Sequence, residues 1–155
     1  MSSQTLVVKS EKEMAQVAGR LAPLLKTGDI VTLSGELGAG KTVLARALVN
    51  ALSPAPEEVP SPTFTLVQVY ELPRFSLWHF DLYRLENVKK DILELGWDEA
   101  RRSGVAVVEW PDRLGGLLPK DRLDVTIDHC KDSENHRRIT LTPSGKWTAR
   151  LERQA

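Results

Sequence analysis

The chain has a single cysteine and no excess of either charge, and these two absences exclude several kinds of protein. Cys130 stands alone among 155 residues, so the chain can form neither an internal disulfide nor a Cys-rich zinc site. Lysine plus arginine and aspartate plus glutamate both number 21, which leaves no overall basic field for nucleic acid and no acidic excess typical of disorder. This composition suits a reducing cytoplasm.

Long apolar runs, internal repeats and low-complexity tracts are also missing. No segment approaches the roughly 18 uninterrupted apolar residues of a membrane span, and residues 1–5 do not begin a secretion signal. We therefore expect a cytoplasmic protein with no membrane association. The length favours one domain over residues 1–155, with residues from about 144 onward as a C-terminal extension. Residues 137–155 are locally basic. We interpret this segment as a solvated surface rather than an RNA-binding patch, because most charge runs are solvated surfaces.

The segment GELGAGKT at residues 35–42 matches the phosphate-binding pattern G-x-x-x-x-G-K-[ST] at every specified position. An apolar, β-branched run at residues 29–33 enters it, and apolar residues at helical spacing follow from Lys41 onward. Glycines let successive N–H groups point at phosphate oxygens, Lys41 reaches the β- and γ-phosphates, and the Thr42 hydroxyl is a Mg²⁺ ligand. We therefore predict a bound nucleoside triphosphate with Mg²⁺. The predicted contacts are Gly35, Glu36, Leu37, Gly38, Ala39, Gly40, Lys41, Thr42 and Val43.

Helices and strands are predicted on both sides of this loop. Residues 5–8 are expected to form an edge strand, and the capping box Ser10-x-x-Glu13 to start a helix. Proline-rich residues 53–62 predict an exposed loop that can move. The remaining predicted elements are a hairpin (65–70 and 75–83), a helix (88–95) with a further turn (98–102), a buried central strand (105–108), and paired strands (123–127 and 138–142) around a polar turn (132–135). The predicted fold class is a three-layer α/β P-loop fold with a mixed parallel and antiparallel sheet and flanking helices.

Two carboxylates are candidates to complete the phosphate site. Glu109 directly follows the apolar run at residues 105–108, so we expect its side chain at the sheet edge where ligands bind in open α/β folds. We assign it to the metal, directly or through water, or to the attacking water. Asp81 is the second candidate metal ligand, because in a strand it shares a face with His79 and Tyr83. The alternative for Asp81 and His79 is the solvent-facing side of an edge strand.

Two further positions have an open role. Trp110 either stacks on adenine or fills core space, the usual role of an aromatic side chain. Thr63 or Thr65, in the segment SPTFT, could contact the γ-phosphate or Mg²⁺ and so order the loop. The alternative is an ordinary turn with hydroxyl caps.

Three other functions compete with an ATPase. A small GTPase is suggested by residues 112–115 (DRLG), which fit D-x-x-G, but Pro111 separates them from the strand and no Asn-Lys-x-Asp follows. A small-molecule kinase should have an arginine-bearing lid and an acceptor pocket, and neither is evident. A nucleotide-controlled interaction module with negligible turnover is the third possibility.

Four motifs together resemble one family. They are GELGAGKT at 35–42, SPTFTL at 61–66, HFDLYRL at 79–85 and EWP at 109–111. In this order and spacing they are similar to the bacterial TsaE family, also called YjeE, over the chain to about residue 142. The resemblance implies an ATPase that acts with the TsaB and TsaD proteins in making threonylcarbamoyladenosine at position 37 of tRNA. It also implies that ATP hydrolysis resets the TsaB–TsaD dimer between turnovers, with tRNA contacted indirectly or weakly.

The resemblance also assigns roles to individual residues. It implies that Lys41 and Thr42 hold phosphates and Mg²⁺, and that Glu109 and Asp81 serve the metal and hydrolysis. Residues 61–65 resemble a switch loop. Glu11, near the start of the first helix, and Arg137 or a neighbouring residue are expected to border the nucleotide. The chain departs from the family at Val43, where a second threonine is frequent, and matches it only loosely over residues 130–138.

Overall fold

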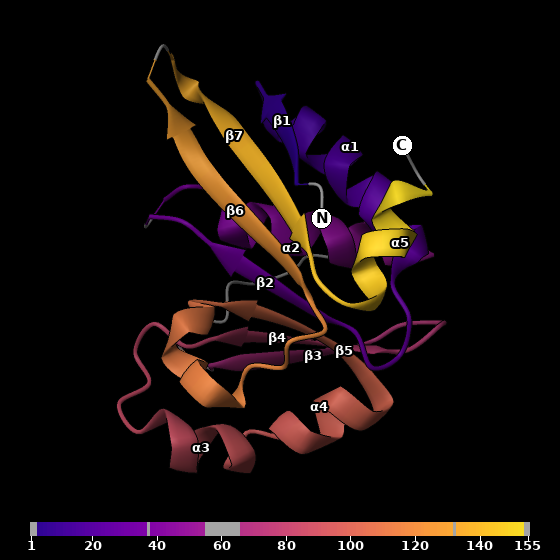
Figure 1. The fold of residues 1–155 in the computed structure, drawn as a ribbon, viewed down its shortest axis with the longest axis vertical. Coiled ribbons are helices and arrows are strands. Elements are labelled where there is room, and N and C mark those ends of the chain that lie inside the picture. The colour runs from indigo at the N-terminus through magenta and orange to yellow at the C-terminus, as the bar shows by residue number, and fades with distance from the viewer. Residues whose placement is uncertain (1–2, 37, 55–65, 132, 154–155) are drawn as a thin grey trace.

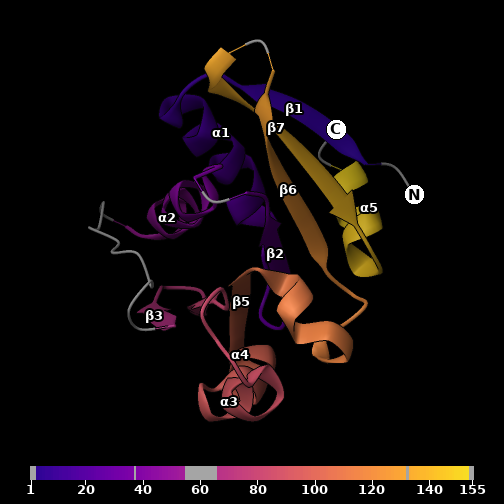
Figure 2. The same ribbon diagram turned by 90° about the vertical axis from the view of Figure 1, so that its left-hand side faces the viewer.

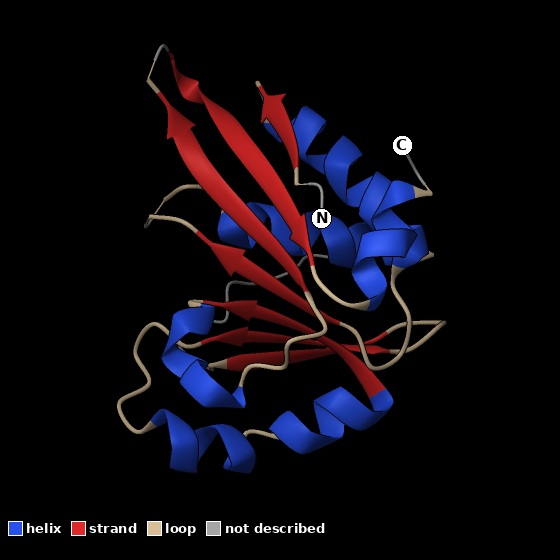
Figure 3. Cartoon of the chain, in the orientation of Figure 1, coloured by secondary structure: helices blue, strands red, loops and turns tan. Residues whose placement is uncertain are grey.

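A seven-stranded sheet with strand order β1-β7-β6-β2-β5-β4-β3 forms the centre of the molecule (Figures 1 and 3). The computed structural model describes residues 3–36, 38–54, 66–131 and 133–153. In chain order the elements are β1 (Gln4–Val8), α1 (Glu11–Leu21), the 3-10 helix η1 (Ala22–Leu24), β2 (Ile30–Ser34), α2 (Lys41–Leu52), β3 (Val67–Glu71), β4 (Ser76–Asp81), α3 (Val88–Glu94), α4 (Trp97–Ser103), β5 (Gly104–Glu109), the 3-10 helix η3 (Pro111–Leu117), β6 (Leu123–Cys130), β7 (Ser133–Pro143) and α5 (Lys146–Glu152).

The sheet is mixed, and its central strand β5 is buried on both faces, as predicted. Strand β2 pairs in parallel with β5 and β6, and β4 pairs in parallel with β5, while the outer pairs are antiparallel. Every residue of β5 is buried. Val105 and Val107 join the core cluster under α1 and α2, whereas Ala106 and Val108 join the cluster with α3 and α4. The result is three layers, with α1 and α2 grouped apart from α3 and α4 (Figure 2).

The N-terminal unit forms where its sequence signals predict. The Ser10 hydroxyl accepts a hydrogen bond from the Glu13 N–H at 3.2 Å and caps α1. The Glu13 carboxylate accepts in turn from the Lys9 N–H at 3.1 Å, one residue earlier than in the standard capping box. Strand β1 pairs only with β7 and is an edge of the sheet.

The structure excludes one alternative and corrects one prediction. Strand β4 is not an edge, because β3 pairs with its outer side, and His79 in β4 is fully buried, so the alternative of a solvent-facing edge strand does not hold for His79. The turn expected at residues 132–135 is shorter, because β6 continues to Cys130 and β7 begins at Ser133. This hairpin carries exposed polar residues beyond the apolar core, so its outer part shows no alternation of apolar and polar side chains.

The helices lie on the sheet, and within the described ranges none is long and apolar enough to cross a membrane. Helix α5 contributes Trp147 and Leu151 to the cluster under α1 and α2. The Arg150 guanidinium in α5 donates to the Leu24 carbonyl at 3.1 Å and pairs with the Asp29 carboxylate at 2.5 Å. These contacts join the C-terminal helix to the segment that leads into β2.

The close approach of β4 and β5 requires a residue without a side chain at the start of β5. A Cβ on Gly104 would lie 2.5 Å from the Ser76 carbonyl oxygen, so Gly104→Ala is expected to lower the free energy of unfolding by about 1–3 kcal/mol. Gly19→Ala is the matched control, because Gly19 lies on the exposed side of α1 and a Cβ added there would have no neighbour within 4 Å. It should raise that free energy by about 0.5–1 kcal/mol. Urea denaturation measures both, and equal effects would contradict the proposed crowding.

Candidate functional site

The loop between β2 and α2 has the backbone geometry of a phosphate cradle. Gly35 has φ +146°, and a Cβ there would lie 2.3 Å from the Ile127 carbonyl oxygen, so no larger residue fits. Gly40, the N-cap of α2, has φ +114° and makes no side-chain cap. The first N–H groups of α2 are therefore left to face the loop, an arrangement that favours anions.

Lys41, the first residue of α2, is held inside this loop. Its Nζ donates to the carbonyl oxygens of Gly35 and Glu36, the second at 3.1 Å, and lies 4.0 Å from the Trp110 ring centroid. Burial lowers the pKa of Lys41, and the carboxylates of Glu109 and Asp81 oppose this shift. The Lys41 ammonium group therefore contacts two loop carbonyls and the Trp110 ring, and it lies in the electrostatic field of the Glu109 and Asp81 carboxylates.

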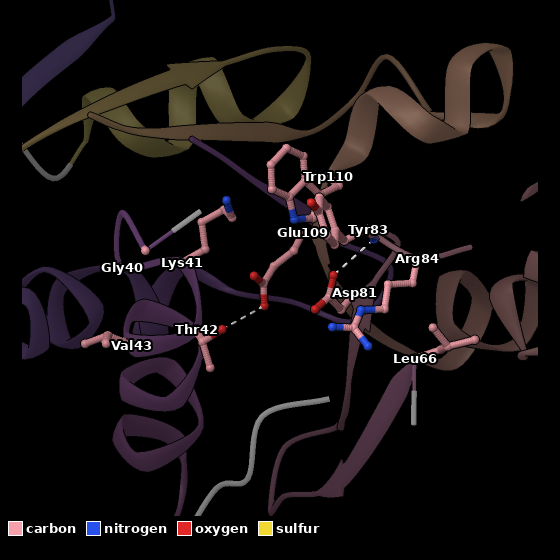
Figure 4. A pocket seen from close by; sticks show the side chains of 11 residues that line it. Gly40, Lys41, Thr42, Val43, Leu66, Asp81, Tyr83, Arg84, Glu109 and Trp110 are labelled. Atoms are coloured by element: carbon pink, nitrogen blue, oxygen red, sulfur yellow. Dashed lines mark hydrogen bonds between the residues drawn. The ribbon is translucent and has the colours of Figure 1, made fainter. Parts of the chain in front are cut away.

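The two predicted carboxylates lie at the same edge of the sheet as the loop. The parallel register of β4 and β5 places Asp81 beside Glu109, and Glu109 is the last residue of β5. The Thr42 hydroxyl donates to Glu109 Oε2 at 3.4 Å (Figure 4). The three predicted metal ligands Thr42, Asp81 and Glu109 thus face one space, and all three offer the oxygen atoms that Mg²⁺ prefers.

The buried side chain of His79 makes a hydrogen bond with the Glu109 carboxylate. Its Nε2 lies 2.6 Å from Glu109 Oε2, and both side chains are buried. The buried Nδ1 has no hydrogen-bond partner among the described residues. An unpaired buried acceptor is tolerated better than an unpaired N–H, so we place the proton on Nε2, which then donates to Glu109. The sequence signal for this role was the two-residue spacing from Asp81, but it did not identify Glu109 as the partner.

Asp81 is less buried than Glu109 and has a different environment. Its Oδ1 accepts a hydrogen bond from the Tyr83 N–H at 3.1 Å. Burial raises the pKa of Asp81, the Tyr83 hydrogen bond opposes the shift, and Glu109 adds to it. In the described part of the chain no three His, Cys, Asp or Glu residues are grouped to hold a metal ion. Mg²⁺ usually combines one or two carboxylates with phosphates and water, so this donor set fits Mg²⁺ only together with a phosphate ligand.

Two cavities adjoin the loop. The first, here called the carboxylate cavity, has a volume of about 480 Å³ and contains Asp81 and Glu109. The second, the α1 cavity, has a volume of about 490 Å³ and contains Glu11 and Arg137. Gly38, Gly40 and Val43 line both. The predicted residues in the carboxylate cavity are Gly38, Gly40, Lys41, Thr42, Val43, Asp81, Glu109 and Trp110, and those in the α1 cavity are Glu11, Gly38, Ala39, Gly40, Val43 and Arg137.

Two predicted residues of the loop, Gly35 and Glu36, line neither cavity. Gly35 and Glu36 accept hydrogen bonds from Lys41 through their carbonyls. Leu37 and Thr63 lie outside the described residues. Arg137 borders the α1 cavity, and its Nε also donates to the Ala39 carbonyl at 3.0 Å, so it supports the loop from β7.

One aromatic side chain and one arginine of the carboxylate cavity, Tyr83 and Arg84, extend the predicted set. The Tyr83 and Trp110 rings lie 4.9 Å apart, and Trp110 has φ +62°. Tyr83 and Arg84 line the cavity but were given no ligand contact from the sequence, although both belong to the motif HFDLYRL. The competing switch motif lies elsewhere: Asp112 is an exposed residue of η3 and lines neither cavity.

A buried strand, a glycine-rich loop and a helix that starts with Lys-Thr, beside a parallel strand ending in glutamate, define a P-loop α/β protein. The model of the family "Threonylcarbamoyl adenosine biosynthesis protein TsaE" matches residues 8–139. The chain belongs to this TsaE family.

Individual relatives agree with the family assignment. The TsaE protein of Rickettsia bellii is 36% identical over 140 residues, which cover 90% of this chain and 96% of that protein. The TsaE protein of Bacillus subtilis is 38% identical over 135 residues, or 86% of this chain and 82% of that protein. The crystal structure of Bacillus subtilis YdiB aligns with a TM-score of 0.81 at 27% identity, covering 99% of this chain and 94% of that chain. The similarity therefore extends over the whole fold.

Asp81→Asn is expected to stabilise the nucleotide-free protein at neutral pH. Because the folded-state pKa of Asp81 is raised above 3.8, the ionised carboxylate costs stability above that folded-state pKa. Removing the charge should raise the melting temperature at pH 7 by about 1–3 °C. The gain should disappear as the pH falls below 3.8, where the wild-type carboxyl is protonated in both states.

Thermal unfolding of both proteins across this pH range measures the effect. Asp128→Asn is the matched control, because Asp128 is an exposed acid of β6. A destabilised Asp81→Asn protein at pH 7, or a gain independent of pH, would contradict the argument.

Proposed function

We propose that this chain binds ATP with Mg²⁺, hydrolyses it, and acts in tRNA threonylcarbamoyladenosine biosynthesis. One observation carries the proposal: the Thr42 hydroxyl of the phosphate loop lies 3.4 Å from the buried Glu109 carboxylate in a chain of the TsaE family. A loop that served only as a turn would not require a buried carboxylate next to its hydroxyl group. A carboxylate held in a fixed position beside a phosphate-binding loop is typical of nucleotide-hydrolysing sites.

We infer that one nucleotide would occupy both cavities, because they share the wall formed by Gly38, Gly40 and Val43. The triphosphate would lie against the loop, with Lys41 at the β- and γ-phosphates. The base would lie in the α1 cavity, where Glu11 and Arg137 offer an acceptor and donors. Trp110 would then serve the phosphate end, since its ring lies over Lys41.

Hydrolysis would use the residues of the carboxylate cavity. Glu109 would orient the attacking water or accept its proton, and the hydrogen bond from His79 would keep the carboxylate in place. Thr42 and Asp81 would hold the metal ion together with phosphate oxygens. Bound Mg²⁺ would neutralise charge on the β- and γ-phosphates. Lys41 would stabilise the charge that develops on the leaving group.

We propose that the energy of hydrolysis is used on a protein partner. The relatives from Rickettsia bellii and Bacillus subtilis are named tRNA threonylcarbamoyladenosine biosynthesis proteins, and we extend that role to this chain. As in the resemblance described above, the partner would be the TsaB–TsaD dimer, reset between turnovers. Balanced overall charge supports an indirect or weak contact with tRNA, in the cytoplasm.

Lys41→Ala tests the nucleotide site. We expect ATP hydrolysis by the wild type to appear or increase when purified TsaB–TsaD dimer is added, with ATP preferred over GTP in competition. Lys41→Ala should abolish turnover and weaken ATP binding by about 100-fold, because a charged contact to phosphate is lost. Lys120→Ala, which removes an exposed lysine outside both cavities, is the control. If the dimer neither binds nor changes turnover, the assignment of function fails.

Glu109→Gln separates hydrolysis from binding. We expect turnover to fall by about 10²–10⁴-fold, while ATP and the TsaB–TsaD dimer still bind, because the amide cannot accept a proton. Single-turnover kinetics and isothermal titration calorimetry measure the two properties. Glu94→Gln, at an exposed site of α3, is the control. Undiminished turnover would exclude Glu109 from hydrolysis, and negligible turnover in the wild type with nucleotide-dependent dimer binding would favour the interaction module.

A further inference from the structure

We propose that Arg84 is a catalytic arginine supplied by the chain itself, which contacts the γ-phosphate during hydrolysis. This inference rests on the proposed ATPase function and adds a residue to it. Among the described residues that line the carboxylate cavity, Lys41 and Arg84 are the cationic ones. Figure 4 shows the Arg84 side chain directed into the same space as Asp81, opposite the Thr42 side of the cavity.

The backbone that carries Arg84 is fixed to the proposed hydrolytic residue. The Leu82 N–H donates to the Glu109 carbonyl at 3.2 Å, and the Tyr83 N–H donates to the Asp81 carboxylate at 3.1 Å. Leu82 and Leu85, which flank Tyr83 and Arg84 in the sequence, have buried side chains. The backbone that leads into Arg84 is therefore held by the Glu109 carbonyl and the Asp81 carboxylate, which belong to two residues of the site.

Two further hydrogen bonds stabilise the turn formed by residues 82–85. The Leu85 N–H donates to the Leu82 carbonyl at 3.2 Å, and the Arg113 guanidinium donates to the Leu85 carbonyl. A turn held by this many bonds can present a side chain with little loss of backbone entropy on ligand binding. The backbone at Arg84 is therefore held in place, as a side chain that contacts phosphate requires.

The guanidinium of Arg84 is available, in contrast to other arginines around the site. Arg113 is engaged with the Leu85 carbonyl, and Arg137 with the Ala39 carbonyl. Arg84 is exposed and makes no hydrogen bond or ion pair with the described residues. A guanidinium presents several N–H donors in one plane, which suits two oxygens of one phosphate.

The chemistry of hydrolysis calls for a cation at this position. The water oxygen forms a bond to the γ-phosphorus while the bond from phosphorus to the β–γ bridging oxygen breaks, giving ADP, phosphate and one proton. The proton leaves the water through Glu109, and Arg84 stays charged throughout. In the transition state negative charge is spread over the three equatorial γ-oxygens as the bond to the leaving oxygen breaks, and an arginine that stabilises this charge can be worth about 10³–10⁵ in rate. Lys41 reaches the β- and γ-phosphates from the loop, and Arg84 would contact the γ-phosphate from the opposite wall.

The test compares Arg84→Ala and Arg84→Lys with the wild type in complex with the TsaB–TsaD dimer. Steady-state kinetics would give kcat and KM for ATP, and calorimetry would give the affinities for ADP and for ADP with aluminium fluoride, which mimics the transferring phosphoryl group. Arg101→Ala is the matched control, because Arg101 is an exposed arginine that lines a different cavity beside Gly28. Dimer binding would be measured for every variant in a pull-down experiment.

We expect Arg84→Ala to lower kcat by about 100-fold or more, with KM, ADP affinity and dimer binding within about twofold of wild type. Affinity for ADP with aluminium fluoride should fall in parallel with kcat. Arg84→Lys should recover part of both, since it keeps the charge but loses the planar pair of donors. Arg101→Ala should behave as wild type.

Two results would overturn the inference while the proposed function stands. In the first, Arg84→Ala keeps the wild-type kcat. In the second, Arg84→Ala loses turnover because it no longer binds the dimer, while its affinity for ADP with aluminium fluoride is unchanged. The second result would make Arg84 a contact for the partner. Absence of ATP binding by the wild-type protein would instead remove the proposed function, and the role of Arg84 with it. Lys41→Ala distinguishes these cases, because it should lose ADP affinity as well as turnover.

Discussion

The parallel pairing of β4, β5 and β2 in one register is the constraint on which the site depends. Parallel neighbours end at the same edge of a sheet, so Asp81, Glu109 and the loop after β2 are brought together by backbone hydrogen bonds alone. A shift of one residue in β5 would turn Glu109 to the other face, away from Thr42. The apolar alternation of β5 between two core clusters prevents that shift, because it would exchange the residues that face each layer.

Much of this arrangement can be predicted from the sequence, because its signals are local. The glycine pattern, the capping box at Ser10 and the apolar run before Glu109 each depend on neighbouring residues, and the structure has elements at all three. The fold class follows from the order of these elements. The position of β4 within the sheet does not follow from this order. A strand with a polar His79 has the same sequence pattern whether it lies at the edge of the sheet or pairs with a further strand such as β3.

The contacts that could not be predicted are those between distant segments. The bond between His79 and Glu109 spans 30 residues and depends on strand order, and the support of the loop by Arg137 spans 98. Arg84 was visible in its motif, but only the turn anchored to the Glu109 carbonyl gives its side chain a direction. Such pairings require the tertiary structure, because no periodicity in the sequence encodes them.

The contact between Lys41 and Trp110 has a consequence for how the site responds to ligand. The lysine is not a bare cation, because two loop carbonyls and an aromatic ring already act as its ligands. In the proposed nucleotide complex, phosphate binding would therefore be an exchange reaction, whose free energy is the difference between two sets of partners for one ammonium group. The ring is also in contact with Tyr83, so displacement of the ammonium group changes the surroundings of an aromatic pair that lines the cavity. Occupancy of the loop by the proposed nucleotide would thereby be coupled to the surroundings of this aromatic pair.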